Sequence, residues 1–141
     1  METAEPPLAG KRTHSVLRTV LAVETLAVAA LAFWHNSVED ALFLMLVMAG
    51  IPLLWLAAYC FFFKLRTGEV AICAVGELLL ALQIGVWGYF LICHAEDGLG
   101  LGIMLFLVGV LGQLAFLFLL LALQGWLAWH RRAAHTPHGE V

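Results

Sequence analysis

The sequence predicts an all-α integral membrane protein, a four-helix bundle that runs up-down-up-down with both termini in the cytoplasm. Of its 141 residues, 63% are hydrophobic and only 12% are charged. A soluble domain has roughly 45–50% apolar and about 25% charged residues, so lipid must cover the apolar surface that a core of this size cannot bury. Strands are excluded because the apolar stretches are long and do not alternate with polar residues.

Four apolar stretches form the predicted transmembrane bundle, at about 16–34, 41–63, 70–93 and 101–129. Each is close to or above the roughly 20 residues that a helix needs to cross the hydrocarbon layer. The connections are short, which favours antiparallel packing of sequence neighbours. The polar segments 1–15 and 130–141 are predicted cytoplasmic tails.

The first span has one competing interpretation. Ala30 and Ala32 resemble a signal-peptide cleavage site after a basic start. Glu24 interrupts the apolar core that such a signal needs, so we predict that this span is retained as a membrane helix.

The predicted orientation follows from the charged residues. Every Lys and Arg lies before the first span, in its opening turns, in the middle connection or after the last span. They are Lys11, Arg12, Arg18, Lys64, Arg66, Arg131 and Arg132. The two remaining connections carry acids instead. Because cytoplasmic ends are enriched in Lys and Arg, this pattern places both termini in the cytoplasm.

Two acids lie inside the predicted spans: Glu24 in the first and Glu77 in the third. These spans run in the same direction, and at 1.5 Å per residue both acids lie roughly 10–12 Å from the cytoplasmic helix ends. Gln124 of the fourth span lies within about one turn of this depth. We therefore predict an intramembrane polar cluster of Glu24, Glu77 and Gln124.

The acids allow two interpretations. No Lys or Arg lies deep enough to neutralise them, so at least one is expected to hold a proton near neutral pH. Protonated acids can hold helices together through hydrogen bonds. Alternatively, the two acids relay protons or cations across the membrane. The sequence places Glu24 and Glu77 at one depth without showing whether their helix faces meet.

Helical periodicity predicts close packing in the third and fourth spans. Small residues recur on one face of each, which allows another membrane helix to approach closely. The predicted helix-packing residues are Ala74, Ala81 and Gly88 in the third span, and Gly102 and Gly109 in the fourth.

Two amides lie toward the outer half of their spans, and one proline lies midway through the second span. Gln83 and Gln113 are predicted to form an upper polar layer above the acids. Pro52 follows Gly50 in the second span and is expected to kink that helix. This span has few polar side chains, so we expect it to face lipid or a partner protein.

The sequence offers little for catalysis or cofactors. It contains no Walker loop, HExxH pattern or Ser-His-Asp arrangement, and its connections are too short for an aqueous active site. His35 and His94, at the outer ends of two spans, are the candidate haem or metal ligands, but interfacial histidines are commonly solvated. We therefore predict no enzyme activity, no catalytic residues, no metal and no cofactor.

The overall outline resembles that of the small multidrug resistance transporters. The resemblance rests on a chain of four spans with little sequence outside them and on a glutamate within the first span. It implies that Glu24 binds protons and cations. The second acid, Glu77, and the longer polar tails depart from that pattern, so we assign no family.

We predict a non-catalytic accessory, scaffold or stabilising subunit of a larger membrane complex. The alternative is a small proton-coupled transporter or channel that works as a homo-oligomer through Glu24 and Glu77. The predicted partners are the bilayer, other membrane subunits or further copies of the chain. The net charge is −3 and no domain is strongly basic, so we predict no binding of nucleic acid.

Overall fold

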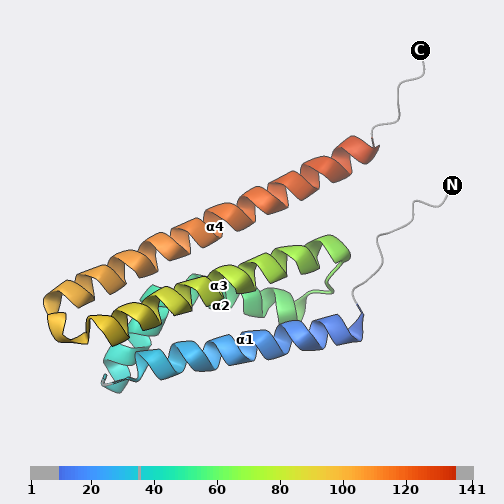
Figure 1. Cartoon of the computed structure of the whole chain (residues 1–141). Helices are drawn as coiled ribbons and strands as arrows, with labels where there is room; N and C mark the ends of the chain where they lie inside the picture. The colour runs from blue at the N-terminus through green and yellow to red at the C-terminus, as the bar shows by residue number, and fades with distance from the viewer. Residues whose placement is uncertain (1–9, 35, 136–141) are drawn as a thin grey trace, which may run out of the picture.

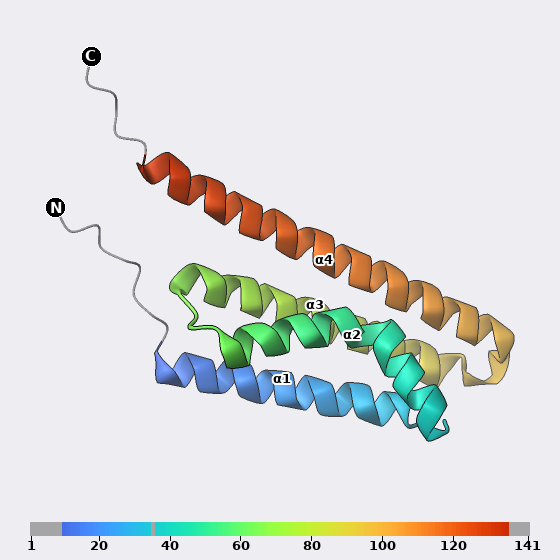
Figure 2. The same ribbon diagram turned by 180° about the vertical axis from the view of Figure 1, so that it is seen from behind.

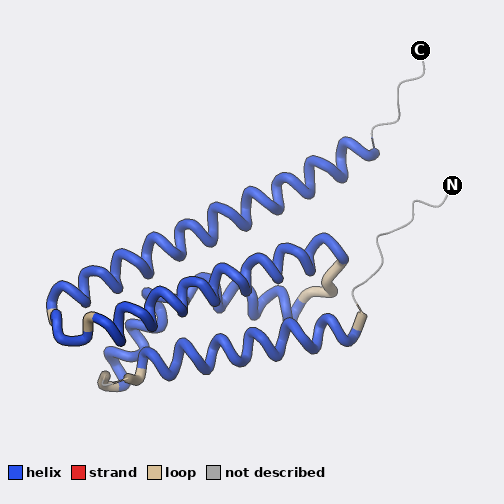
Figure 3. Tube along the Cα trace, viewed as in Figure 1, coloured by secondary structure: helices blue, strands red, loops and turns tan. Residues whose placement is uncertain are grey.

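The described part of the chain folds into four α-helices joined by short connections (Figure 1). The computed structural model describes residues 10–34 and 36–135, and every regular element within them is helical (Figure 3). The helices are α1 (Lys11–Ala32), α2 (Val38–Phe62), α3 (Thr67–Cys93) and α4 (Leu99–His135), with one 3₁₀ turn at Ala95–Asp97. All four α-helices are long and apolar enough to cross a membrane, so the chain is an integral multi-pass membrane protein.

Polar caps start α2 and α3 a few residues before their apolar stretches. The backbone N–H of Asp40 donates to the Ser37 hydroxyl at 3.3 Å, and Glu39 and Asp40 lie in the first turn of α2. The backbone N–H of Arg66 donates to the Glu69 carboxylate at 2.9 Å. Acids in the first turn complement the helix dipole. These charged first turns precede the apolar stretches, so the helices begin outside the hydrocarbon layer.

The turn between α3 and α4 depends on one glycine. Gly98 has φ +45° and ψ −103°, a conformation that residues with a Cβ rarely adopt. It lets the chain reverse between the 3₁₀ turn and α4.

The helices α2 and α3 form the centre of the bundle. Each of them contacts the other three helices. The described residues of α1 and α4 make no contact with each other, and these helices lie on opposite sides of the α2–α3 pair (Figures 1 and 2). The expectation that the second span faces lipid or a partner stays a prediction, because α2 contacts the other helices and also has exposed apolar side chains at Leu42, Leu46 and Leu54.

Large apolar side chains fill the interior and also cover the outside. The largest fully buried side chains are Trp87, Phe116, Met48, Leu56, Leu65, Leu80 and Leu120. Leu26, Leu54 and Phe118 are 70–77% exposed, in keeping with a surface that lipid rather than water covers.

Three glycines allow α2, α3 and α4 to approach one another closely. A Cβ added to Gly109 would lie 2.9 Å from the Val47 carbonyl oxygen, and one added to Gly76 would lie 2.9 Å from the Leu56 side chain. Gly112 leaves similar room for the side chain of Gln83. Small residues thus allow close approach within this bundle, although the sequence predicted only Gly109 among the three.

The other predicted packing residues do not mediate close contacts inside the chain. Ala74, Ala81 and Gly102 are exposed, and half-buried Gly88 faces the side chain of Leu31. Helix packing at the exposed positions stays a prediction, because both sides of a membrane helix are apolar and a small residue suits contacts within and outside the chain. Small residues alone do not distinguish the interior from the lipid-facing side.

Candidate functional site

Glu24 faces the interior of the bundle because it shares a helix face with large aliphatic residues. Leu17, Leu21 and Val28 lie on the same side of α1 at helical spacing, and all three are buried. The Glu24 side chain is itself only 7% exposed. An acid on this face is expensive in hydrocarbon unless it finds a proton or a partner.

Glu77 likewise lies on the buried face of its helix, α3. Its helix face includes Cys73, Gly76 and Leu80, which are all buried. The Glu77 side chain is 6% exposed, so the two acids are buried to the same extent.

The structure buries both carboxylates in the part of the bundle where α1 packs against α3. They are close enough for their charges to interact, which the sequence alone could not show. Oε2 of Glu24 and Oε1 of Glu77 are both buried without a hydrogen-bond partner. The nearest basic residue along α1 is turned elsewhere, since Nε of Arg18 donates to the Cys60 carbonyl oxygen at 2.9 Å.

Two thiols complete the surroundings of the acids. Cys60 of α2 and Cys73 of α3 are buried and free, and a hydrogen bond joins their side chains. Both thiols interact electrostatically with Glu77. The polar cluster predicted from the sequence did not include these thiols. The spacing of Cys73 four residues before Glu77 was the available signal.

Gln124 does not join the acid pair. Its side-chain amide donates instead to the hydroxyl of Tyr59, whose ring stacks on Trp55 with centroids 4.1 Å apart. The predicted cluster of three polar residues is therefore a pair of acids and a separate Gln124–Tyr59 contact between α4 and α2.

The two amides of the predicted upper layer both bind the backbone of α2. Nε2 of Gln83 donates to the Met48 carbonyl oxygen, which is the acceptor that Pro52 leaves without its helical N–H. Oε1 of Gln113 accepts from the Ile51 N–H at 3.1 Å, and Nε2 of Gln113 donates to the Val47 carbonyl oxygen. Gln113 thus bridges the two backbone groups that a regular helix would bond to each other.

Sequence reasoning identified these amides but not their target. Counting back four residues from Pro52 gives Met48, whose carbonyl oxygen loses its donor. A buried acceptor in a membrane must be satisfied from a neighbouring helix, and α3 and α4 supply the two glutamines.

Residues 10–34 and 36–135 contain no group of three His, Cys, Asp or Glu side chains that could hold a metal ion. Nδ1 of His94 lies 3.3 Å from the Asp97 carboxylate in the turn after α3. His35 falls outside the described residues.

The acid pair has a defined chemical capacity. Two buried carboxylates whose charges interact are both ionised only at high cost in a low-dielectric interior, so the pair can hold a proton. Comparison with protein-family models, curated proteins and solved structures gives no match for this chain.

Proposed function

We propose that this protein is a non-catalytic accessory subunit that packs against other membrane proteins and stabilises their assembly. It crosses the bilayer up-down-up-down with both termini in the cytoplasm. The observation that carries the accessory role is a groove on the outer face of α3. The charge pattern of the chain supports the orientation.

The groove has a volume of about 410 Å³ and lies along one side of α3. Ala81 and Gly85 form its floor with three residues between them, and a Cβ at Gly85 would meet open space. Its remaining lining side chains are Leu78, Leu82, Val86 and Tyr89. Two small residues at this spacing let the backbone of a second helix approach closely in a membrane.

Ala81 is exposed in the groove, so the groove is open to whatever surrounds the protein in the membrane. Flexible acyl chains gain less from a shallow groove than a rigid helix does, because helix association in lipid depends on close van der Waals packing. A transmembrane helix of another subunit is therefore the occupant that fits it best.

The test is the composition of the protein after gentle extraction. Tagged wild-type chain in native nanodiscs should carry other membrane proteins at a fixed ratio. Gly85→Leu and Ala81→Leu should remove those proteins, because the longer side chains fill the groove. Ala115→Leu, a matched change at an exposed position of α4, should keep them. A wild-type preparation without any other membrane protein would overturn the accessory role.

A small proton-coupled transporter or channel is the second candidate. The buried Glu24–Glu77 pair supports it, because each acid has an oxygen without a hydrogen-bond partner. In this case the groove of α3 joins copies of the same chain. A homo-oligomer lost in Gly85→Leu would favour this candidate over the accessory role.

A further inference from the structure

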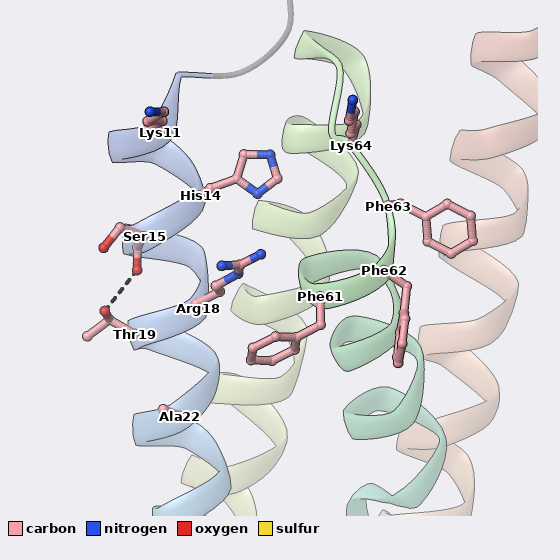
Figure 4. A pocket seen from close by; sticks show the side chains of 10 residues that line it. All are labelled: Lys11, His14, Ser15, Arg18, Thr19, Ala22, Phe61, Phe62, Phe63 and Lys64. Atoms are coloured by element: carbon pink, nitrogen blue, oxygen red, sulfur yellow. Dashed lines mark hydrogen bonds between the residues drawn. The ribbon is translucent and has the colours of Figure 1, made fainter.

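A second polar feature lies where α1 begins and α2 ends, and its inner end, at Ala22, comes within two residues of Glu24. A cleft of about 800 Å³ opens between these two helices. Lys11, His14 and Arg18 line it from α1, and Lys64 lines it from the segment after α2 (Figure 4). Neither Glu24 nor Glu77 takes part in it, so the cleft needs an explanation of its own.

The cleft concentrates positive charge without an internal counter-charge. None of its lining residues is an acid, and the first turn of α1 contains no acid either. The start of a helix carries partial positive charge of its own. In the described part of the chain, Lys11, Arg18 and Lys64 have no acidic partner, so an anion from outside the chain would be attracted here.

Arg18 is held in a defined position within the cleft. Its Nε donates to the Cys60 carbonyl oxygen at 2.9 Å, and its guanidinium carbon lies 5.1 Å from the centre of the Phe61 ring. These contacts leave the two Nη groups of the guanidinium for a ligand. A planar guanidinium fits two oxygens of one phosphate.

The cleft changes from polar to apolar along its length. The axial distance from Lys11 to Ala22, which line its two ends, is roughly 16 Å. Phe61 and Phe62 border it and are 58% and 85% exposed. A ligand with an anionic group at one end and an apolar chain at the other matches this gradient.

We propose that this cleft binds a phosphate group, and that its source is the headgroup of an anionic phospholipid. The phosphate lies among Lys11, Arg18 and Lys64, and an acyl chain follows Phe61 and Ala22 into the membrane. A soluble phosphate compound shares the headgroup chemistry but would leave the apolar half of the cleft empty. This site does not depend on the accessory role proposed above.

The test compares two double variants of equal charge. Lys11→Gln/Lys64→Gln removes two cations from the cleft, whereas Arg12→Gln/Arg132→Gln removes two cations that do not line it. Each protein is titrated in detergent with phosphatidylglycerol or phosphatidylcholine, and native mass spectrometry counts the bound lipids. A parallel series adds inorganic phosphate as the only ligand and as a competitor.

We expect the wild type and the Arg12/Arg132 variant to retain one phosphatidylglycerol in preference to phosphatidylcholine. The Lys11/Lys64 variant should bind it about fivefold more weakly per cation removed, or roughly 30-fold in all. Inorganic phosphate that fails to compete supports the lipid source. Phosphate that competes and loses affinity in the same variant supports the phosphate site but overturns the lipid source. Equal weakening in both variants, or equal binding of the two lipids, would overturn the site itself.

Discussion

Glu24 and Glu77 show how one side chain can dominate the energetics of a membrane helix. Each lies on an otherwise apolar buried face, and each has a carboxylate oxygen without a hydrogen-bond partner. An ionisable group at membrane depth costs about 2.5–3.5 kcal/mol on insertion scales. The native bundle therefore contains two groups that oppose its own stability unless a proton occupies the site.

Replacing either acid by its amide should not destabilise the bundle. Glu24→Gln and Glu77→Gln preserve side-chain size and remove the charge that burial penalises, so we expect the free energy of unfolding to stay within about 1 kcal/mol of the wild type or to increase. Unfolding in mixed detergent micelles measures this, with Glu96→Gln at an exposed position outside the four α-helices as the control. A large loss of stability in either variant would show that the ionised carboxylate has a favourable partner.

The same two variants decide the second candidate function. In proteoliposomes, a relay stops when either acid becomes an amide, because an amide does not release a proton. Proton-coupled flux that survives both substitutions would exclude a transport mechanism through this pair.

The break in α2 is the clearest feature at the scale of a whole element. Pro52 removes one helical donor, and the amides of Gln83 and Gln113 replace the lost backbone bonds from two neighbouring helices. The kink is therefore held by hydrogen bonds between elements. This arrangement favours a fixed bend over a hinge.

We predict that Gln83 stabilises the protein more strongly while Pro52 is present, although its weaker bond to the Gly109 carbonyl oxygen remains in either case. Gln83→Leu should cost about 0.6–1.7 kcal/mol in the wild type, the range measured for hydrogen bonds between membrane helices. In a Pro52→Ala background the cost should fall, because alanine supplies an N–H to the Met48 carbonyl oxygen. A double-mutant cycle of unfolding free energies measures the coupling.

Gln124→Leu provides the control for this cycle. Its amide donates to the Tyr59 hydroxyl rather than to a backbone carbonyl, so its cost should be the same with and without Pro52. Equal costs for Gln83→Leu in both backgrounds would contradict the assignment of Gln83 to the proline break.

The helices were predictable from the sequence, but several of their faces were not. Long apolar stretches bounded by charged residues identify membrane helices directly. In water, polar residues would also mark the outer face, whereas here lipid accepts apolar side chains on every face. Gly109 lies at a contact between helices, as expected. Ala81 is exposed, and its packing role stays a prediction, because a small residue suits both an internal contact and an external one. The burial of Glu24 and Glu77 in the same part of the bundle depends on the packing of α1 against α3, which no local pattern encodes.

The whole molecule gathers its Lys and Arg residues at one end. Lys11 and Lys64 share one cleft, and the Arg131 guanidinium of α4 lies against Gly68 at the start of α3. Asp97 follows the opposite end of α3. This distribution is the physical basis of the proposed orientation, in which the basic end faces the cytoplasm.

Cys93 gives a direct test of that orientation. It is exposed at the acidic end of α3, whereas Cys60 and Cys73 are buried. A membrane-impermeant maleimide applied to intact cells should label one thiol, and Cys93→Ser should abolish the label. Labelling of Cys93 only after the membrane is permeabilised would show that the orientation is the opposite of the one proposed.

The contact between α1 and α3 has a consequence for biosynthesis. The first helix emerges from the ribosome with Glu24 on its inner face, before its partner exists. Glu77 is made roughly 50 residues later, or about 3–10 s at ordinary rates of synthesis. During that interval Glu24 lacks the helix that later covers it, so α1 should remain beside the insertion machinery and enter the lipid fully only when α3 arrives.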